Sequence, residues 1–300
     1  MNRAMLFVLF LLLMTATAGV FQATAGSLAV HEIHQVTRSG EYTAPRFSPD
    51  GSRLAAAGPG YGEVVLLEET AALRVLMSAP GVGYGFLWLP DSSGLVFRTR
   101  VNGRSLVRRL DLDGRLRECG EIMDSCLPAR YKDTVFFIDP AGEPHIIMGN
   151  LPPEALVFVT VKNDVIVLHK GQAARRISPD GDRFFLPVLS PDGSHVLFEG
   201  MTTGIWTYRI ADNRLVNIGQ GNHPSWAPDG FFVYFDVEED DGERVTAAEL
   251  WRATPDGTVR ECLTATPAVI EMRPAAAPDG GRIAYDAGGS IFLAELEEQP

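Results

Sequence analysis

The heptapeptide PRFSPDG occupies residues 45–51 and returns in altered form four times. The later copies are FLWLPD at 86–91, PVLSPDG at 187–193, PSWAPDG at 224–230 and PAAAPDG at 274–280. The shared Pro-Asp-Gly favours a tight turn, because Pro presets φ, Asp can bond its own backbone and Gly accepts positive φ. Apolar or alternating runs flank each copy, which indicates strand, turn and strand. The repeat therefore predicts a β-strand repeat architecture.

The spacing of the copies predicts the number of repeat units. The turn aspartates stand at positions 50, 91, 192, 229 and 279, so the clear steps are 41, 37 and 50 residues. The gap of 101 residues between 91 and 192 holds two or three steps. Residues 120–180 fill that gap with strand-like runs that lack the phrase. We predict an all-β fold, a β-propeller in which six blades are favoured and seven are possible.

The two ends of the chain predict how the ring closes. The last unit has three strands, whereas residues 31–37 (HEIHQVT) form a spare strand before the first copy. We expect this N-terminal strand to complete the C-terminal blade, because closure removes exposed sheet edges.

Composition and the N-terminus predict where the protein works. At 46% hydrophobic and 21% charged, the 300 residues have an ordinary globular composition. Residues 1–25 are typical of a signal peptide, with Arg3, an apolar run over 5–14 and cleavage after Ala18 or Ala25. We expect an exported protein, periplasmic or secreted, with no stable membrane insertion after cleavage. The net charge of −12 argues against a nucleic-acid partner.

The phrase, its spacing and strands such as GIW (204–206) and ELWR (249–252) resemble the TolB-like, WD-repeat-like propeller repeat. The resemblance covers residues 31–297, and we expect the propeller without the N-terminal domain that TolB proteins carry. We expect a non-catalytic scaffold in the cell envelope that binds a protein or peptide partner, because a rigid propeller gathers its loops on two faces around a central funnel. We expect a monomer without a cofactor.

Candidate binding residues lie where each innermost strand begins. The places directly before the phrase hold Ala44, Gly85, Leu186, His223 and Arg273. Lyases of related propeller type hold a metal there with several histidines. Since this chain has only His223 in that position, a metal site is not favoured. The binding residues predicted at the blade mouths are Arg46, Tyr84, His223 and Arg273.

Two alternatives of different class stay open. One is a metal-dependent propeller enzyme, a polysaccharide lyase or lactonase, and the other is a glycan-binding module using the channel and residues 240–245. The acidic run over 238–243 is interpreted as a solvated hairpin tip.

The cysteines allow one disulfide. Cys119 and Cys262 occupy equivalent positions in separate units and should not meet. Cys119 with Cys126 is the plausible disulfide, and free thiols are the alternative.

Overall fold

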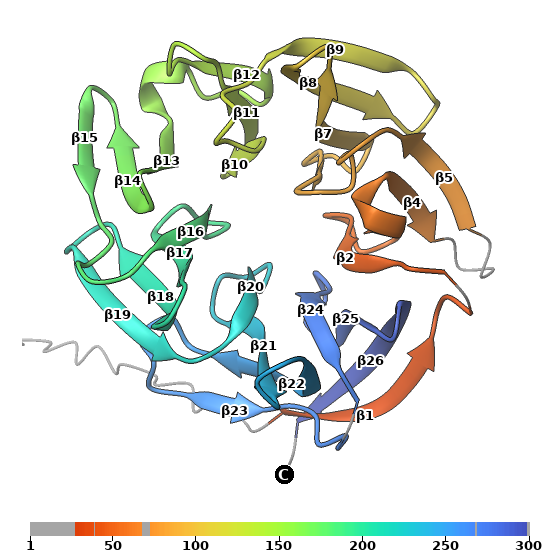
Figure 1. The fold of residues 1–300 in the computed structure, drawn as a ribbon. Helices are drawn as coiled ribbons and strands as arrows, with labels where there is room; N and C mark the ends of the chain where they lie inside the picture. The colour runs from red at the N-terminus through yellow and green to blue at the C-terminus, as the bar shows by residue number, and fades with distance from the viewer. Residues whose placement is uncertain (1–27, 39, 68–72, 268, 299–300) are drawn as a thin grey trace, which may run out of the picture.

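The computed structural model describes residues 28–298 except 39, 68–72 and 268, and within them the fold is all-β (Figure 1). Seven small antiparallel sheets stand around a central axis as the blades of a propeller. The predicted signal peptide, 1–25, lies outside the described residues. No helix within the described part of the chain is long and apolar enough to cross a membrane.

The blades are numbered here in chain order, and each sheet runs from an inner to an outer strand. Blade 1 contains β2 (Thr43–Phe47), β3 (Leu54–Ala57), β4 (Glu63–Leu67) and β5 (Leu73–Ser78), with the short 3-10 helix η1 (Pro59–Tyr61) between β3 and β4. Blade 2 contains β6 (Leu87–Trp88), β7 (Gly94–Val101), β8 (Arg104–Asp111) and β9 (Leu116–Glu121). Blade 3 contains β10 (Ala129–Tyr131), β11 (Thr134–Ile138) and β12 (Pro144–Met148); after η2 (Pro153–Ala155), blade 4 contains β13 (Val157–Lys162), β14 (Val165–Lys170) and β15 (Ala173–Arg176).

The second half of the ring is more regular. Blade 5 contains β16 (Phe184–Leu189), β17 (His195–Gly200), β18 (Gly204–Arg209) and β19 (Arg214–Gly219). Blade 6 contains β20 (Asn222–Trp226), β21 (Val233–Asp240), β22 (Val245–Ala253) and β23 (Arg260–Cys262). Blade 7 contains β24 (Glu271–Ala276), β25 (Arg282–Ala287), β26 (Ser290–Glu298) and, as its outer strand, β1 (Leu28–Gln35).

The predicted closure of the ring is confirmed. Strand β1 pairs antiparallel with β26, so that His34 lies opposite Leu293 and Gln35 opposite Phe292. The closing strand spans 28–35 rather than 31–37. Figure 1 shows the first and last strands side by side in one blade.

The favoured count of six blades is wrong, because residues 129–176 form two blades. Each of these two sheets has three strands instead of four. Both therefore fit between the turn aspartates Asp91 and Asp192, where the average spacing of the phrase predicted fewer than three steps. Their first hairpins also use a different turn from the repeated phrase. Asn163 and Asp164 both have positive φ and form a two-residue hairpin loop, and Lys132 with Asp133 forms another.

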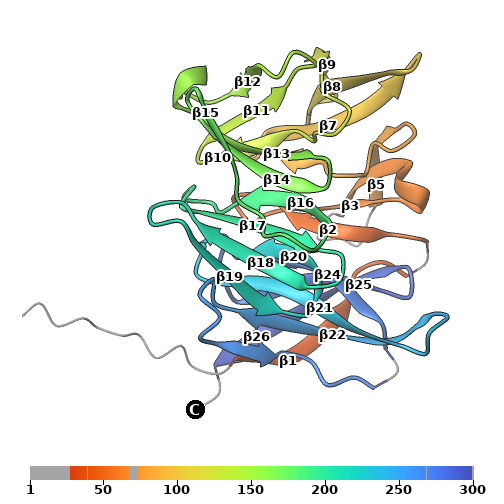
Figure 2. The same ribbon diagram turned by 60° about the vertical axis from the view of Figure 1, so that its left-hand side comes forward.

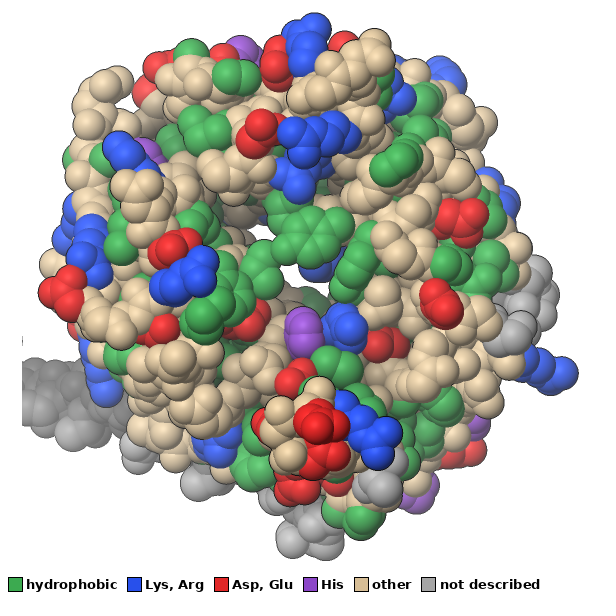
Figure 3. All heavy atoms as spheres, in the orientation of Figure 1, with side chains coloured by type: hydrophobic (Ala, Val, Ile, Leu, Met, Phe, Trp, Pro, Cys, Tyr) green, Lys and Arg blue, Asp and Glu red, His purple; other side chains and the backbone are tan. Residues whose placement is uncertain are grey.

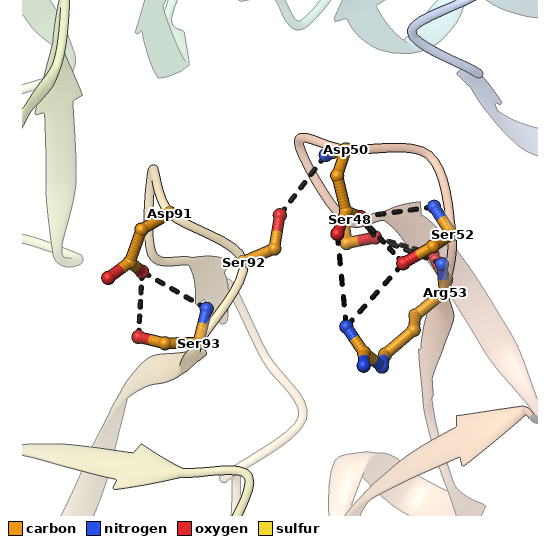
Figure 4. A network of polar contacts seen from close by, with 7 residues as sticks. All are labelled: Ser48, Asp50, Ser52, Arg53, Asp91, Ser92 and Ser93. Atoms are coloured by element: carbon orange, nitrogen blue, oxygen red, sulfur yellow. Dashed lines mark hydrogen bonds and ion pairs between the residues drawn. The ribbon is translucent and has the colours of Figure 1, made fainter.

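The Pro-Asp-Gly turn is fixed by its aspartate (Figure 4). The Asp50 carboxylate accepts hydrogen bonds from the Ser48 hydroxyl at 2.5 Å and from the Ser52 amide at 3.0 Å, and Gly51 has φ 71°. The Ser48 hydrogen bond, followed by that of the Ser52 amide, lowers the pKa of Asp50 to about 2. The Asp50 amide donates to the Ser92 hydroxyl of blade 2 at 3.1 Å, so the turn also joins neighbouring blades.

The hydrophobic core lies between adjacent blades rather than within one layer. One buried cluster joins Val64 and Leu66 of blade 1 to Phe86, Leu95 and Phe97 of blade 2. The same face-to-face packing repeats around the ring, as the tilted view of Figure 2 illustrates. Because the inner strand of each blade pairs antiparallel with the second strand, one face of the molecule collects the beginnings of the inner strands and the ends of the second strands. We call this the mouth face.

Candidate functional site

The residues directly before each repeated phrase share one backbone conformation. Ala44, Leu186, His223 and Arg273 have φ between 48° and 54°, and Gly85 has φ 72°. The strand register shifts at each of the four non-glycine positions, so each residue forms a bulge at the mouth face. The equivalence predicted for these five positions is therefore confirmed. A left-handed conformation at a non-glycine residue is strained and persists only where the surroundings hold it.

Buried carboxylates from the preceding blade hold three of these bulges. Asp286 on β25 accepts the Ala44 amide at 3.0 Å, and Asp236 on β21 accepts the Arg273 amide at 2.9 Å. Glu199 on β17 accepts the His223 amide. These three acids, which we call the carboxylate ring, stand at the same place in blades 5, 6 and 7. Sequence reasoning missed them.

A repeat signal could have found the carboxylate ring. Glu199, Asp236 and Asp286 each stand six residues after the glycine of the Pro-Asp-Gly turn. In blade 1 the same offset gives Ala57, which carries no charge. An acid inside an apolar strand at a constant offset in three successive repeats is not what core packing requires.

His223 on β20 is the centre of the group. Its Nδ1 lies 3.0 Å from Asp236 Oδ1 and 3.2 Å from Oδ2, while Asp236 is fully buried. Burial on its own lowers the pKa of His223, but the hydrogen bond and the charge of Asp236 outweigh it and raise the pKa. Asp236 therefore stabilises the protonated form of His223.

Glu238 completes a cluster of possible metal ligands. It lies two residues after Asp236 on β21, so both side chains are on the same face of the strand. One donor atom each from His223, Asp236 and Glu238 lies within 4.8 Å of the other two, the only such group of three found among the described residues. The interpretation of 238–243 as a solvated tip is therefore wrong for Glu238, which is half-buried, whereas Glu239 and Asp240 are exposed.

Arg273 on β24 supplies the fixed positive charge. Its Nη1 lies 3.2 Å from Asp286 Oδ2, and its buried Nε has no hydrogen-bond partner within the described structure. Asp286 also accepts the Thr43 hydroxyl at 2.9 Å. Burial raises the pKa of Asp286 even though Arg273 lowers it.

The charges of the site do not balance. Burial raises the pKa of Glu199 to about 7, and the charges of Asp236 and Glu238 add to the effect. Burial and the charge of Asp236 likewise raise the pKa of Glu238. Two basic side chains, His223 and Arg273, thus face four acids, and such an excess of buried carboxyl groups favours protons or a bound cation.

Figure 3 shows where this group lies. The mouth face is hollowed at its centre, and histidine, basic and acidic side chains gather at the rim over β20 and β24. The structure thus brings together two of the four predicted binding residues, His223 and Arg273.

The other two predicted residues lie elsewhere around the channel. Arg46 on β2 keeps an exposed surface, but protein atoms surround its side chain. The desolvation that results lowers the pKa of Arg46. Its guanidinium carbon lies 5.7 Å from the centre of the Phe86 ring. Tyr84 is 40% exposed and packs edge-to-face on Tyr61, with ring centroids 5.6 Å apart.

The cysteines form no part of the site. Cys119, Cys126 and Cys262 are free thiols, so the Cys119–Cys126 disulfide is not formed in the structure. Both Cys119 and Cys126 pack in the cluster between blades 2 and 3, where burial raises their pKa values.

Comparison with known proteins supports the fold. An oligogalacturonate lyase in complex with manganese is similar over 91% of this chain and 97% of its own, with a TM-score of 0.58 and 14% identity. An oligogalacturonate lyase from Vibrio parahaemolyticus is similar over 90% of this chain and 98% of its own, with a TM-score of 0.58 and 13% identity. No family model and no curated protein matches the sequence, so the TolB-like assignment stays a prediction. At this identity the likeness shows the propeller fold alone.

The expectation of a non-catalytic protein-binding scaffold needs correction. Both similar structures are enzymes, and they match nearly the whole described chain. The metal-dependent enzyme, considered from the sequence as an alternative, agrees better with these similarities. Sequence reasoning set it aside because only one histidine occupies the mouth positions; it did not count carboxylates from the second strands.

Proposed function

We propose that this protein is a metal-dependent propeller enzyme that cleaves an acidic oligosaccharide at the mouth of its central channel. The observation that carries the proposal is the convergence of His223, Asp236 and Glu238, whose donor atoms lie within 4.8 Å of one another. The likeness to oligogalacturonate lyases, one of them in complex with manganese, supports the choice of substrate class and metal.

The donor set fits a hard divalent cation. Two carboxylates and one imidazole suit Mn²⁺ better than Cu⁺ or an iron–sulfur cluster, both of which prefer thiolates. The surplus of acids around His223 and Arg273 also provides the negative field that a divalent cation requires. His223, Asp236 and Glu238 would hold the ion.

The remaining groups would act on the substrate. A bound divalent cation is a Lewis acid that polarises a carboxyl group and so acidifies the adjacent C–H bond. Arg273 is held by Asp286 beside the cluster and offers a cation to a second carboxylate of the substrate. Glu199, with a pKa of about 7, can exchange a proton near neutral pH. Together these residues suit an elimination reaction on a uronate chain.

Metal binding and activity test the proposal separately. Titration of chelator-stripped protein with Mn²⁺, followed by calorimetry, is expected to show one ion per chain. His223→Ala should weaken binding by about 10- to 100-fold or more, because it removes a ligand. His34→Ala is the matched control, since His34 is an exposed histidine on the closing strand.

The activity assay uses oligogalacturonate and follows the near-ultraviolet absorbance of the unsaturated product. We expect Mn²⁺-dependent elimination that His223→Ala and Glu238→Gln both abolish. Absence of stoichiometric Mn²⁺ binding, or binding that His223→Ala leaves unchanged, would overturn the metal assignment. Metal binding without cleavage of any uronate polymer would overturn the reaction assignment.

A further inference from the structure

A second hollow opens on the mouth face, between blades 1 and 2. Its volume is about 430 Å³, within the range of small-ligand pockets. The walls come from η1, the loop after β5 and the hairpin of β7 and β8, and they include Tyr61, Tyr84, Arg98 and Arg100. Figure 3 shows basic side chains over β7 on this face.

The pocket carries a positive charge that the protein does not neutralise. Arg98 donates to the backbone carbonyls of Asp124 at 2.8 Å and Cys126 at 3.0 Å, which are neutral acceptors. Arg100 makes no ion pair or hydrogen bond with any described residue and is exposed. The one acid on the wall is Asp124, whose Oδ1 accepts the Ser105 hydroxyl at 2.6 Å. Two guanidinium groups against one carboxylate leave the pocket cationic.

The same walls carry aromatic surface. Tyr84 and Tyr61 stand edge-to-face, and Tyr84 remains 40% exposed. An exposed aromatic face packs well against the apolar C–H face of a sugar ring. The Thr99 hydroxyl on the pocket wall is buried and has no hydrogen-bond partner among the described residues.

The pocket and the His223, Asp236 and Glu238 cluster both lie on the mouth face. The pKa of Tyr84 is raised chiefly by burial and next by the charge of Tyr61. The charge of Arg98 lowers this pKa, and the charge of Glu199 raises it. Of the carboxylate ring, Glu199 therefore acts on the Tyr84 hydroxyl. An extended ligand on this face would meet both places.

We propose that this pocket binds a carboxylate-bearing sugar unit, which pairs with Arg100 and Arg98 and packs on Tyr84. The proposal deepens the proposed function and rests on it for one point, that the sugar unit belongs to the chain cleaved at the metal cluster. The binding itself requires no metal, because none of the pocket residues belongs to that cluster.

The test measures binding of oligogalacturonate to metal-free protein by calorimetry at low ionic strength. Its methyl ester, which has the same sugar backbone without the charge, is the parallel ligand. We expect the acid to bind and the ester to bind at least about tenfold more weakly, the effect of losing one charged hydrogen-bonded pair. Arg100→Gln and Tyr84→Ala should each weaken binding of the acid by a similar factor.

Two variants control for the fold and for general charge. Tyr84→Phe keeps the ring and should retain binding. Arg115→Gln removes an exposed arginine in the turn between β8 and β9, at the end of the hairpin away from the pocket, and should also retain binding. Binding that is indifferent to esterification, or to both Arg100→Gln and Tyr84→Ala, would overturn the pocket, and so would the absence of binding at millimolar ligand. The His223→Ala protein separates the two proposals, since it should lose Mn²⁺ but still bind the acid.

Discussion

Glu199→Gln should stabilise the protein at alkaline pH. Glu199 is 5% exposed, and burial among the other acids raises its pKa to about 7 from an ordinary value of 4.5. A carboxyl with a raised pKa is held protonated in the folded state between these values, while the unfolded chain releases the proton. Stability therefore falls as the pH rises from about 4.5 to 7, and it stays low above that range.

The magnitude follows from the shift. Each pKa unit corresponds to about 1.4 kcal/mol, so ionised Glu199 costs the folded state up to about 3 kcal/mol at pH 8. Glutamine keeps the carbonyl that accepts the His223 amide but cannot ionise. At pH 8 the variant should gain about 1–3 kcal/mol over the parent, and at pH 5 the two should be nearly equal.

The assay is urea unfolding of both proteins at pH 5 and pH 8 with a chelator present, because a bound cation would compensate the charge. His223, Asp236 and Glu238 also face Glu199, but they are common to both proteins. Glu143→Gln, at an exposed turn, is the control and should show no such pH dependence. An advantage that is equal at the two pH values would refute the idea that Glu199 is buried with its charge poorly compensated.

Two further predictions concern the scaffold. Asp50→Ala should lower the free energy of unfolding by about 1–2 kcal/mol in urea titrations, because the turn loses the hydrogen bonds of Ser48 and Ser52 to the carboxylate; an unchanged midpoint would contradict the role assigned to the phrase. Gly204→Ala should cost at least about 2 kcal/mol, since φ is +77° and the new Cβ would lie 2.3 Å from the Gly219 carbonyl oxygen, and thermal melting would show it. Gly103→Ala has a similar φ of +81° but open space around the Cβ, so equal losses at the two glycines would exclude the steric argument.

The fold was largely predictable because one turn repeats. Proline, aspartate and glycine act locally, so their recurrence predicted the strands, the ring and its closure without knowledge of distant contacts. The number of blades was not predictable in the same way. In blades 3 and 4, two-residue loops such as Asn163-Asp164 connect the first two strands, so these blades lack the repeated phrase.

The site was half predictable, for a different reason. His223 and Arg273 stand next to the phrase, so their position could be inferred from the repeat. Glu199 and Asp236 lie inside strands. Their role in the site depends on contacts with the next blade, which the sequence does not show. Glu238 belongs to a run of acids, and only the length of β21 shows that the run begins inside the mouth rather than at the tip.

The closing strand has a consequence for the order of folding. Residues 28–35 form the first described strand to be synthesised but pair with β26, with Leu28 opposite Glu298 and Gln35 opposite Phe292. At a synthesis rate of roughly 5–20 residues per second, the strand waits on the order of tens of seconds for its partner. During that time it is an unpaired edge, and the charged and imidazole side chains of His31, Glu32 and His34 would hinder association with other chains. The nascent protein therefore cannot complete its seventh blade, which adjoins His223, Asp236 and Glu238, before β26 has been synthesised.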